Sequence, residues 1–319
     1  MRIIITRPLP GNPQQILCDA GFTDIWINPR EERLTPQEFR AAVPGARAIL
    51  TTPMDRVDSP LLDAAGPQLI IVSNYAVGYD NIDVAEVKRR GAIVGNTPGA
   101  VTEPTADIAW LLLLGAARRA QEGIDLLRSG TWSGVAPMQL LGTRLGGKTL
   151  FILGAGRIGT AAARRAPGFG VNLIYTARSR KPELEKPPIN AAFVTLEEGL
   201  AQADFTSIHV PLNEATRHLI NAGRLGQMRS SAILVNTSRG GVIDEGALVA
   251  ALRERRIAAA GLDVFENEPA LHPGLIDLPN VFLLPHLGSA TREDREWMMR
   301  LAVGNIIAAL RGQPVPHSV

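Results

Sequence analysis

Short apolar runs alternate with helix-like stretches through the first hundred residues. The runs that predict strands are RIIIT (2–6), ARAILTT (46–52), QLIIVSNYAVG (68–78) and AIVGNTPG (92–99), and IDVAEVKRRG (82–91) predicts a helix before the last of them. Strands that are apolar along their whole length are typical of a parallel sheet with helices on both faces. We therefore expect the first part of the chain to be an α/β layer structure.

The same alternation resumes after residue 147 and predicts a second α/β unit. Its strand-like runs are KTLFILGAGRIG (148–159), FTSIHVPL (205–212), AILVNTSRGG (232–241), AAAGLDVF (258–265) and VFLLPHLGSAT (281–291). A last helix is expected over 291–312, and the segment GQPVPHSV that follows it is expected to be a loose tail.

A helical pattern over residues 102–128 separates the two α/β parts. Leu111, Leu112 and Leu114 make this stretch too densely apolar for a helix with one buried face. We expect a helix that is buried between domains or between subunits.

Composition narrows the class of protein. The 319 residues are 45% hydrophobic and 20% charged, which is typical of a globular protein, and the length favours two domains. The net charge of +2 comes without a run of like charges, so nucleic acid or an acidic membrane surface is not an indicated partner. A single cysteine, no apolar run long enough for a membrane span, and no signal-peptide core lead us to expect a soluble, cytoplasmic protein.

The clearest motif is G-x-G-x-x-G, formed by Gly154, Gly156 and Gly159. It follows an apolar strand and opens a helix, which is the context in which it binds dinucleotides. The first glycine permits the tight turn, the second lets a pyrophosphate approach the backbone, and the third lets helix and strand pack closely. The alternative is a tight strand–helix turn without a ligand.

A basic loop lies where NAD sites carry an acidic residue. That acidic residue, about twenty positions after the motif, binds the ribose 2′-hydroxyl. Here the strand ends near Ala177 and is followed by Arg178, Ser179, Arg180 and Lys181. Arginines attract a 2′-phosphate, which a carboxylate would repel. The sequence therefore predicts NADP as cofactor, with NADPH preferred over NADH, unless these residues are simply a solvated basic loop.

Polar groups just after three apolar strands suggest the chemistry. Arg239, Glu268 and His286 each follow one strand, and the carboxyl ends of strands in an open α/β sheet face the ligand crevice. A 2-keto acid needs a cation for its carboxylate, a proton for its carbonyl oxygen and a hydride for its carbon. Arginine and histidine supply the first two, and a carboxylate orients the histidine.

Taken one at a time, these residues have structural interpretations that stay open. His286 alone can be structural, and Glu268 can be an exposed loop residue. Arg239 can pair with Asp244 or Glu245. His209 is a competing histidine that either lines the cofactor site or is plain structure.

The motifs GAGRIG, VNTSRGG, AAAGLDVFENEP and LPHLGSAT occur in this order, and with them the chain resembles the D-isomer-specific 2-hydroxyacid dehydrogenases. The resemblance covers essentially the whole length and is greatest to the glyoxylate/hydroxypyruvate reductase branch. It implies that Arg239, Glu268 and His286 are the catalytic set and that Asp263 lies beside the nicotinamide amide. It also implies that the N–H groups of Val77 and Gly78 hold the substrate carboxylate.

The resemblance also implies the architecture. Two Rossmann-like or flavodoxin-like doubly wound parallel-sheet domains are expected, with the cofactor domain (101–285) inserted into a discontinuous substrate domain (1–100 and 286–319). Members are usually homodimers that contact through the region matching 102–145.

The predicted site residues follow from both lines of reasoning. No metal is expected, and Arg239 and His286 are expected to touch substrate together with Val77, Gly78 and Ser289. The residues expected at the cofactor are Gly154, Gly156, Arg157, Ile158, Gly159, Arg178, Ser179, Arg180, Lys181, Pro211, Thr237, Asp263 and Gly288.

The expected function is NADPH-dependent reduction of glyoxylate or hydroxypyruvate to the 2-hydroxy acid, with His286 as proton donor. Gln139 stands where the reductases of this branch have an aromatic from the partner's arm, so the size of the substrate stays open. The alternatives are a 2-ketogluconate reductase, a phosphite-type dehydrogenase on the same fold and, more remotely, a non-enzymatic dinucleotide-sensing protein.

Overall fold

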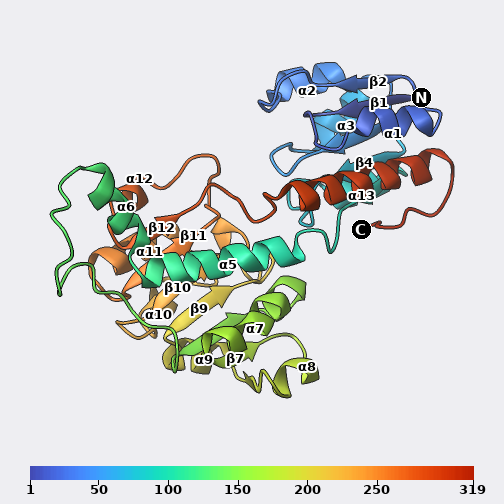
Figure 1. Ribbon diagram of the computed structural model, residues 1–319. Coiled ribbons are helices and arrows are strands. Elements are labelled where there is room, and N and C mark those ends of the chain that lie inside the picture. Colours follow the sequence, from blue (N-terminus) through green and yellow to red (C-terminus); the bar gives the residue numbers. More distant parts are fainter. The chain divides into compact units, whose positions relative to one another are not determined.

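The computed structural model describes all 319 residues, and the chain divides into two compact units. Residues 1–101 and 289–319 form the first unit, and residues 102–288 form the second (Figure 1). Each unit is built on one sheet in which every strand pair is parallel.

The sheet of the first unit has the order β2-β1-β3-β4-β5. Its strands are β1 (Arg2–Ile5), β2 (Ile25–Ile27), β3 (Ala46–Thr51), β4 (Ile71–Asn74) and β5 (Ile93–Gly95). Its helices are α1 (Pro13–Asp19), α2 (Pro36–Ala42), α3 (Ser59–Ala65), α4 (Val84–Arg89) and α13 (Arg292–Leu310).

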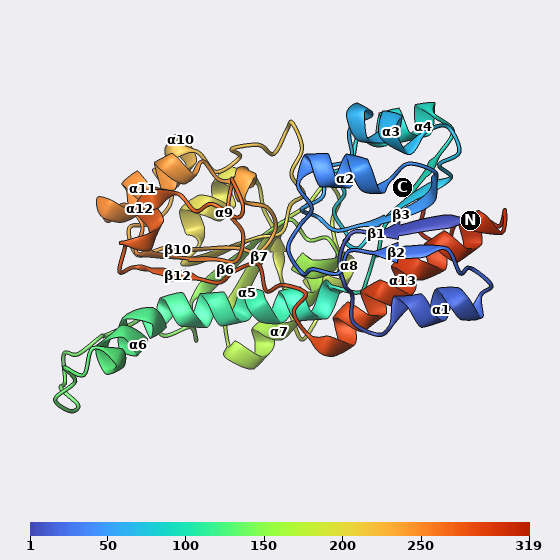
Figure 2. The same ribbon diagram turned by 90° about the horizontal axis from the view of Figure 1, so that it is seen from above.

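Both faces of this sheet are covered, as its continuous apolar strands require. Ile3 and Ile5 point into a core with α1 and α13, whereas Ile4 between them points into a core with α2, α3 and α4. Figure 2 shows α3 and α4 on one side of the sheet and α1 and α13 on the other. Helix α13 returns from the far end of the sequence to complete this unit.

The chain end is not the loose tail that the sequence suggested. The N–H of Val319 donates to Val94 O (2.9 Å), and the N–H of Asn96 donates to His317 O (3.0 Å). Ser318 forms an antiparallel bridge with Gly95. The last residues therefore cover the open edge of β5, which would otherwise expose unpaired backbone groups.

The sheet of the second unit has the order β12-β11-β10-β9-β6-β7-β8. Its strands are β6 (Thr149–Leu153), β7 (Asn172–Thr176), β8 (Ala192–Phe193), β9 (Phe205–Ile208), β10 (Ile233–Asn236), β11 (Ala259–Leu262) and β12 (Val281–Leu283). The predicted fold class, two doubly wound parallel α/β domains, is confirmed.

Helices again cover both faces of this sheet. They are α5 (Thr102–Ala117), α6 (Ala120–Arg128), α7 (Arg157–Phe169), α8 (Pro182–Glu185), α9 (Leu196–Gln202), α10 (Ala222–Leu225), the short η1 (Gly240–Val242), α11 (Glu245–Arg253) and α12 (Pro273–Ile276). Leu150 and Ile152 of β6 point into the core under α5 and α7, and Phe151 and Leu153 point into the core under α9 to α12.

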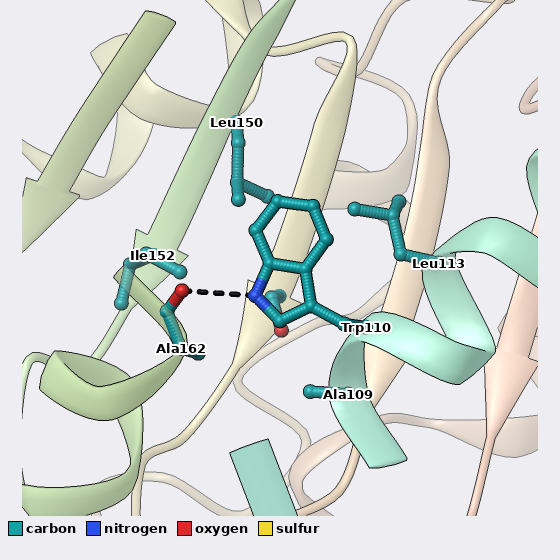
Figure 3. A pocket seen from close by; sticks show the side chains of 7 residues that line it. Ala109, Trp110, Leu113, Leu150, Ile152 and Ala162 are labelled. Carbon is teal, nitrogen blue, oxygen red and sulfur yellow. Dashed lines mark hydrogen bonds between the residues drawn. The ribbon is translucent and has the colours of Figure 1, made fainter. Parts of the chain in front are cut away.

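Trp110 fixes α5 to α7 and to the sheet. Its indole N–H donates to Ala162 O (2.9 Å), and its ring stacks on Phe169 with centroids 4.2 Å apart. Figure 3 shows the indole directed toward Ala162 of α7, with the side chains of Leu150, Ile152 and Leu113 around it. The void beside the ring is only about 10 Å³, no larger than one water requires.

The stretch predicted as one helix over 102–128 is two helices. Arg119 has a positive φ of 54°, and its guanidinium binds Glu122 in the first turn of α6 (2.8 and 2.6 Å). The returning chain takes the carbonyl at the end of α5, because the N–H of Thr143 donates to Ala117 O (2.7 Å). Within α5, Leu112 is fully buried and Leu111 is 45% exposed.

No helix of the structure has both the length and the apolarity that crossing a membrane requires.

Candidate active site

The glycine motif forms the turn between β6 and α7. Gly154 has a φ of +100°, and a Cβ there would lie 2.8 Å from Val210 Cγ1, so both conformation and packing require glycine. A Cβ on Gly159 would lie 2.1 Å from Gly154 O. These two glycines therefore have structural reasons within the chain itself.

Gly156 has no such reason. Its φ of −78° suits any residue, and a Cβ there would meet nothing within 4 Å. It precedes a helix of 13 residues whose first turn has no side-chain cap, so backbone N–H groups are left for an outside acceptor. Open space over a glycine at an uncapped helix start fits a pyrophosphate that lies against the backbone.

The basic loop after β7 is partly fixed by its own neighbours. Arg180 forms an ion pair with Glu185 (2.8 Å) and lies over the ring of Phe193. The N–H of Lys181 donates to the hydroxyl of Tyr175 (2.6 Å). Arg178 is exposed and makes no hydrogen bond or ion pair, so its guanidinium is available for an anion.

Other expected cofactor residues also lie after strands of this sheet. Thr237, next to the end of β10, is 7% exposed, and its hydroxyl has no hydrogen-bond partner. A buried hydroxyl without a partner is costly, which fits a group that a ligand completes. Gly288 is fixed through its carbonyl, which accepts from Thr105 Oγ1 (2.9 Å). Pro211 is exposed beyond β9.

Arg239 lies on a tight loop after β10. Asn236 Nδ2 donates to Arg239 O (2.9 Å), and Asn236 Oδ1 accepts from the N–H of Ser238 (2.9 Å). The guanidinium of Arg239 also donates to Ser238 O (2.8 Å). The loop therefore holds the half-buried Arg239 at the carboxyl edge of the sheet.

His286 and Glu268, 18 residues apart in the chain, meet at this edge. His286 Nδ1 lies 2.7 Å from Glu268 Oε2, and the other oxygen of Glu268 accepts from the N–H of Phe265 (2.9 Å). The imidazole is 41% exposed, and its Nε2 makes no hydrogen bond. The carboxylate therefore orients the ring and leaves one nitrogen free toward solvent or a ligand.

The charges around Glu268 favour its ionised form. Burial alone would raise its pKa, but the hydrogen bond and charge of His286, the N–H of Phe265 and the charge of Arg239 outweigh that penalty. The pKa of Glu268 is therefore lowered from its ordinary 4.5. The influence of Arg239 on this carboxylate places all three residues in one electrostatic site.

Asp263 holds the turn that carries His286. Its two oxygens accept the N–H groups of Leu287 (2.6 Å) and Gly288 (2.8 Å), and its carbonyl accepts from the N–H of His286 (2.9 Å). His286 itself has a positive φ of 54°, a conformation that non-glycine residues adopt only when their surroundings enforce it. Burial raises the pKa of Asp263 to about 6.

His209, the competing histidine, lies at the end of β9. Its Nε2 is 2.9 Å from Ser207 Oγ, and its Nδ1 is buried without a partner. Burial lowers the pKa of His209 to about 4, so the ring is neutral at physiological pH. A neutral, buried ring of this kind is not suited to delivering protons near neutral pH.

The remaining predicted substrate residues belong to the first unit. Val77 O accepts from Asn96 Nδ2 (2.8 Å) and Gly78 O accepts from Asn74 Nδ2 (2.8 Å), so side chains fix this loop through its carbonyls. The N–H groups of Val77 and Gly78 donate no hydrogen bond. Ser289 is the first residue of the returning segment.

Two further carboxylates lie beside the site, and neither was predicted from the sequence to be a site residue. Glu245, which was considered only as a partner for Arg239, accepts the N–H of Glu266 (2.7 Å) and is 4% exposed. Glu266 Oε1 lies 2.6 Å from Nε2 of His218. A glutamate in the first turn of a helix is usually exposed, so only its position after the Asp244 cap and before the apolar stretch ALVAAL hints at burial.

The profile described as "D-isomer specific 2-hydroxyacid dehydrogenase, NAD binding domain" matches residues 110–288, more than half of the chain. The chain belongs to the D-isomer specific 2-hydroxyacid dehydrogenase family. It is therefore an oxidoreductase whose second unit matches the NAD-binding domain of that family.

Relatives and solved structures of this dehydrogenase family agree over the full length. A glyoxylate reductase of Thermococcus onnurineus is 46% identical, over 100% of this chain and 95% of that protein. A crystal structure of a Thermus thermophilus protein is 41% identical with a TM-score of 0.92, covering 100% of both chains. The NADPH-dependent glyoxylate/hydroxypyruvate reductase of Sinorhizobium meliloti, solved with NADP and malonate, is 34% identical with a TM-score of 0.84 and coverage of 100% and 96%.

Proposed function

We propose that this dehydrogenase reduces glyoxylate or hydroxypyruvate to the 2-hydroxy acid with NADPH. The observation that carries the proposal is the Glu268–His286 pair at 2.7 Å, beside Arg239 and at the carboxyl edge that also carries the glycine turn. The names of the similar glyoxylate reductases support the substrate class.

Each residue of the site has one role in this reaction. Arg239 pairs with the carboxylate of the keto acid and polarises the neighbouring carbonyl. His286 donates its Nε2 proton to the carbonyl oxygen as the alcohol forms. Glu268 accepts from Nδ1, which fixes the ring orientation and favours the protonated imidazole that donation requires.

A bound NADPH supplies the hydride for the keto carbon. The glycine turn and the start of α7 would hold its pyrophosphate, together with Arg157 and Ile158. Arg178, Ser179 and Lys181 would bind the 2′-phosphate, with Arg180 beside them in its ion pair with Glu185. Pro211, Thr237, Asp263 and Gly288 would line the nicotinamide end, where the unpartnered Thr237 hydroxyl finds an acceptor or donor.

The roles of the two units follow from this assignment. The second unit is proposed as the cofactor domain and the first as the substrate domain, with the N–H groups of Val77 and Gly78 and the side chain of Ser289 as substrate contacts. The N–H groups of Val77 and Gly78 donate no hydrogen bond within the chain, so they are suited to binding a carboxylate.

A homodimer is part of the proposal. Helix α6 and the segment after it project from the rest of the second unit (Figure 2). This region exposes large apolar side chains, namely Leu127 (62%), Val135 (92%), Met138 (79%) and Leu141 (57%). An exposed apolar group of this size is typical of a protein interface.

The deciding experiment is a substrate panel. kcat/KM is measured for glyoxylate, hydroxypyruvate and 2-ketogluconate with NADPH and with NADH, and for phosphite with the oxidised cofactors. We expect the highest value for glyoxylate or hydroxypyruvate with NADPH. A higher value for 2-ketogluconate or phosphite would replace the proposed substrate, and tight NADPH binding without turnover of any of them would replace the enzyme by a sensor.

A further inference from the structure

Glu245 binds the turn that carries Glu268, although it lies outside that turn in the chain. It is the first residue of α11, directly after the Asp244 cap, and its side chain is buried. Its Oε1 accepts the N–H of Glu266 at 2.7 Å. A buried carboxylate that binds a single backbone N–H so closely holds that backbone in place.

The turn from Phe265 to Glu268 is bound by two carboxylates in succession. Glu268 accepts the N–H of Phe265 and Glu245 accepts the N–H of Glu266. Of these two, Glu268 belongs to the turn itself and moves with it, whereas Glu245 belongs to α11. Glu245 is therefore the carboxylate that fixes the turn to the rest of the unit.

The loop of Arg239 packs directly on the same turn. A Cβ on Gly240 would lie 1.9 Å from the carbonyl carbon of Phe265, so the two backbones are in contact there. Arg239 and Glu245 are joined by only five residues of chain, which contain the short η1. The position of Glu268 relative to Arg239 therefore depends on the bond from Glu245.

A second contact restrains Glu266, the residue whose N–H binds Glu245. His218 Nε2 binds the carboxylate of Glu266, and the N–H of His218 donates to Gly241 O (2.9 Å). His218 is 41% exposed on its side chain, so this contact is weaker protection for the turn than the buried one from Glu245.

We propose that Glu245 is a positioning residue, whose carboxylate holds the 265–268 turn so that Glu268 meets His286 at Nδ1. This proposal rests on the proposed function, because it assigns Glu245 to the step in which His286 donates a proton. The proposed role of Glu245 is to accept the N–H of Glu266, so an uncharged acceptor at position 245 should also serve.

The test compares Glu245→Met, which removes the acceptor, with Glu245→Gln, which keeps an acceptor oxygen. Asp204→Leu is the matched control, because Asp204 is also buried and accepts a backbone N–H, from Thr149 (2.9 Å), at the opposite edge of the sheet. kcat on glyoxylate, NADPH affinity, Tm and the pH profile of kcat/KM are measured for each.

We expect Glu245→Met to lower kcat about 10- to 100-fold with NADPH affinity kept, because Glu268 is displaced from His286. The acid-side fall in kcat/KM should move to higher pH, because a weakened bond to His286 lowers the pKa of Glu268 less. Two other charged groups act on Glu268, namely Arg239 and Asp263, and both are unchanged in this variant. The charge of Glu245 repels that of Glu268, and both Glu245→Met and Glu245→Gln remove this repulsion.

Glu245→Gln should retain most of the wild-type kcat, and Asp204→Leu should lower Tm and change neither kcat nor the pH profile. A folded Glu245→Met enzyme with wild-type kcat and acid limb would overturn the proposal. So would a Glu245→Gln variant as impaired as Glu245→Met, since charge and not the acceptor would then matter. If Glu245→Met does not fold, Glu245→Asp replaces it, because its side chain is shorter by one methylene and its carboxylate lies farther from the N–H of Glu266. An unchanged acid-side fall in the kcat/KM profile of Glu245→Asp then overturns the proposal.

Failure of the proposed function gives a different result. A wild type without activity on any 2-keto acid refutes the proposed function. The positioning role of Glu245 can still be tested without turnover. Titration of Glu268 by carbon-13 NMR then shows whether its pKa is lowered in the wild type and rises in Glu245→Met. An identical Glu268 titration in both proteins overturns the positioning role.

Discussion

Buried carboxylates lie at both ends of the strands in the seven-stranded sheet, called here the amino edge and the carboxyl edge, and their partners differ. At the amino edge, Asp204 accepts the N–H of Thr149 and pairs with Lys148 and Arg229. At the carboxyl edge, Asp263 binds the two N–H groups of the turn that carries His286. One carboxylate joins strand starts, and the other shapes a turn that presents a titratable side chain.

The pKa values show the same difference. Burial would raise the pKa of Asp204, but the Thr149 N–H and the two cations outweigh burial and lower it. Burial prevails at Asp263 and raises its pKa to about 6. Ionised Asp204 therefore stabilises the fold, a contribution lost as pH falls through its lowered pKa, whereas ionised Asp263 costs stability above pH 6 and that cost disappears as pH falls. A buried carboxylate kept against that cost indicates a role other than stability.

The largest effect is expected from His286→Ala at the carboxyl edge. Without its general acid the enzyme should lose roughly 10²- to 10⁴-fold in kcat. NADPH affinity, measured by fluorescence titration, should not change. Undiminished turnover would remove His286 from the chemistry.

Glu268→Gln is expected to lower kcat/KM about 10²-fold, because an amide does not stabilise a protonated imidazole as a carboxylate does. The wild type should keep activity to below pH 4.5, because the lowered pKa of Glu268 leaves it ionised there. The variant should lack the acid-side fall that Glu268 causes. A pH profile of kcat/KM for both proteins checks this, and identical acid limbs would contradict it.

Arg178→Ala should weaken NADPH binding roughly 10- to 100-fold, the loss of one charge-assisted contact to the 2′-phosphate, and leave NADH affinity nearly unchanged. Arg180→Ala is the matched control. Arg180 already pairs with Glu185, so its removal should weaken NADPH less. Titration of both cofactors measures the two variants, and equal losses for NADPH and NADH would show that the loop does not read the 2′-phosphate.

The smallest effect on activity is expected at the amino edge. Asp204→Leu leaves the Thr149 N–H without an acceptor and should cost about 1–3 kcal/mol of unfolding free energy with kcat unchanged. The difference from wild type should be full above pH 4 and shrink below it, because Asp204 has a lowered pKa. Chemical denaturation at several pH values measures this loss of unfolding free energy. A lowered kcat in Asp204→Leu would contradict the purely structural role of the amino edge.

The sequence predicted those features that local patterns determine. Apolar runs located the longer strands, and the rule that parallel strands end at one edge brought Arg239, Glu268 and His286 into a single hypothesis. The edge strands β2 and β8 were missed, and neither of them contains a fully buried residue. The break at Arg119 escaped because Thr143, far along the chain, takes the carbonyl that would have continued the helix.

Long-range partners explain the other differences. The pairing of Arg180 with Glu185 was not foreseen, so the basic loop seemed to offer one cation more than it does. The docking of residues 317–319 on β5 depends on an open sheet edge, which the sequence does not show. Glu245 resembles an ordinary first-turn glutamate until the turn at Glu266 is placed over it.

The most direct test of the central claim, that Glu268 acts through His286, is a double-mutant cycle. kcat/KM for glyoxylate with NADPH is measured for the wild type, Glu268→Ala, His286→Ala and the double variant. If the two act as a unit, the double variant loses no more than His286→Ala alone. Losses that multiply would show that Glu268 and His286 contribute independently and would contradict the account.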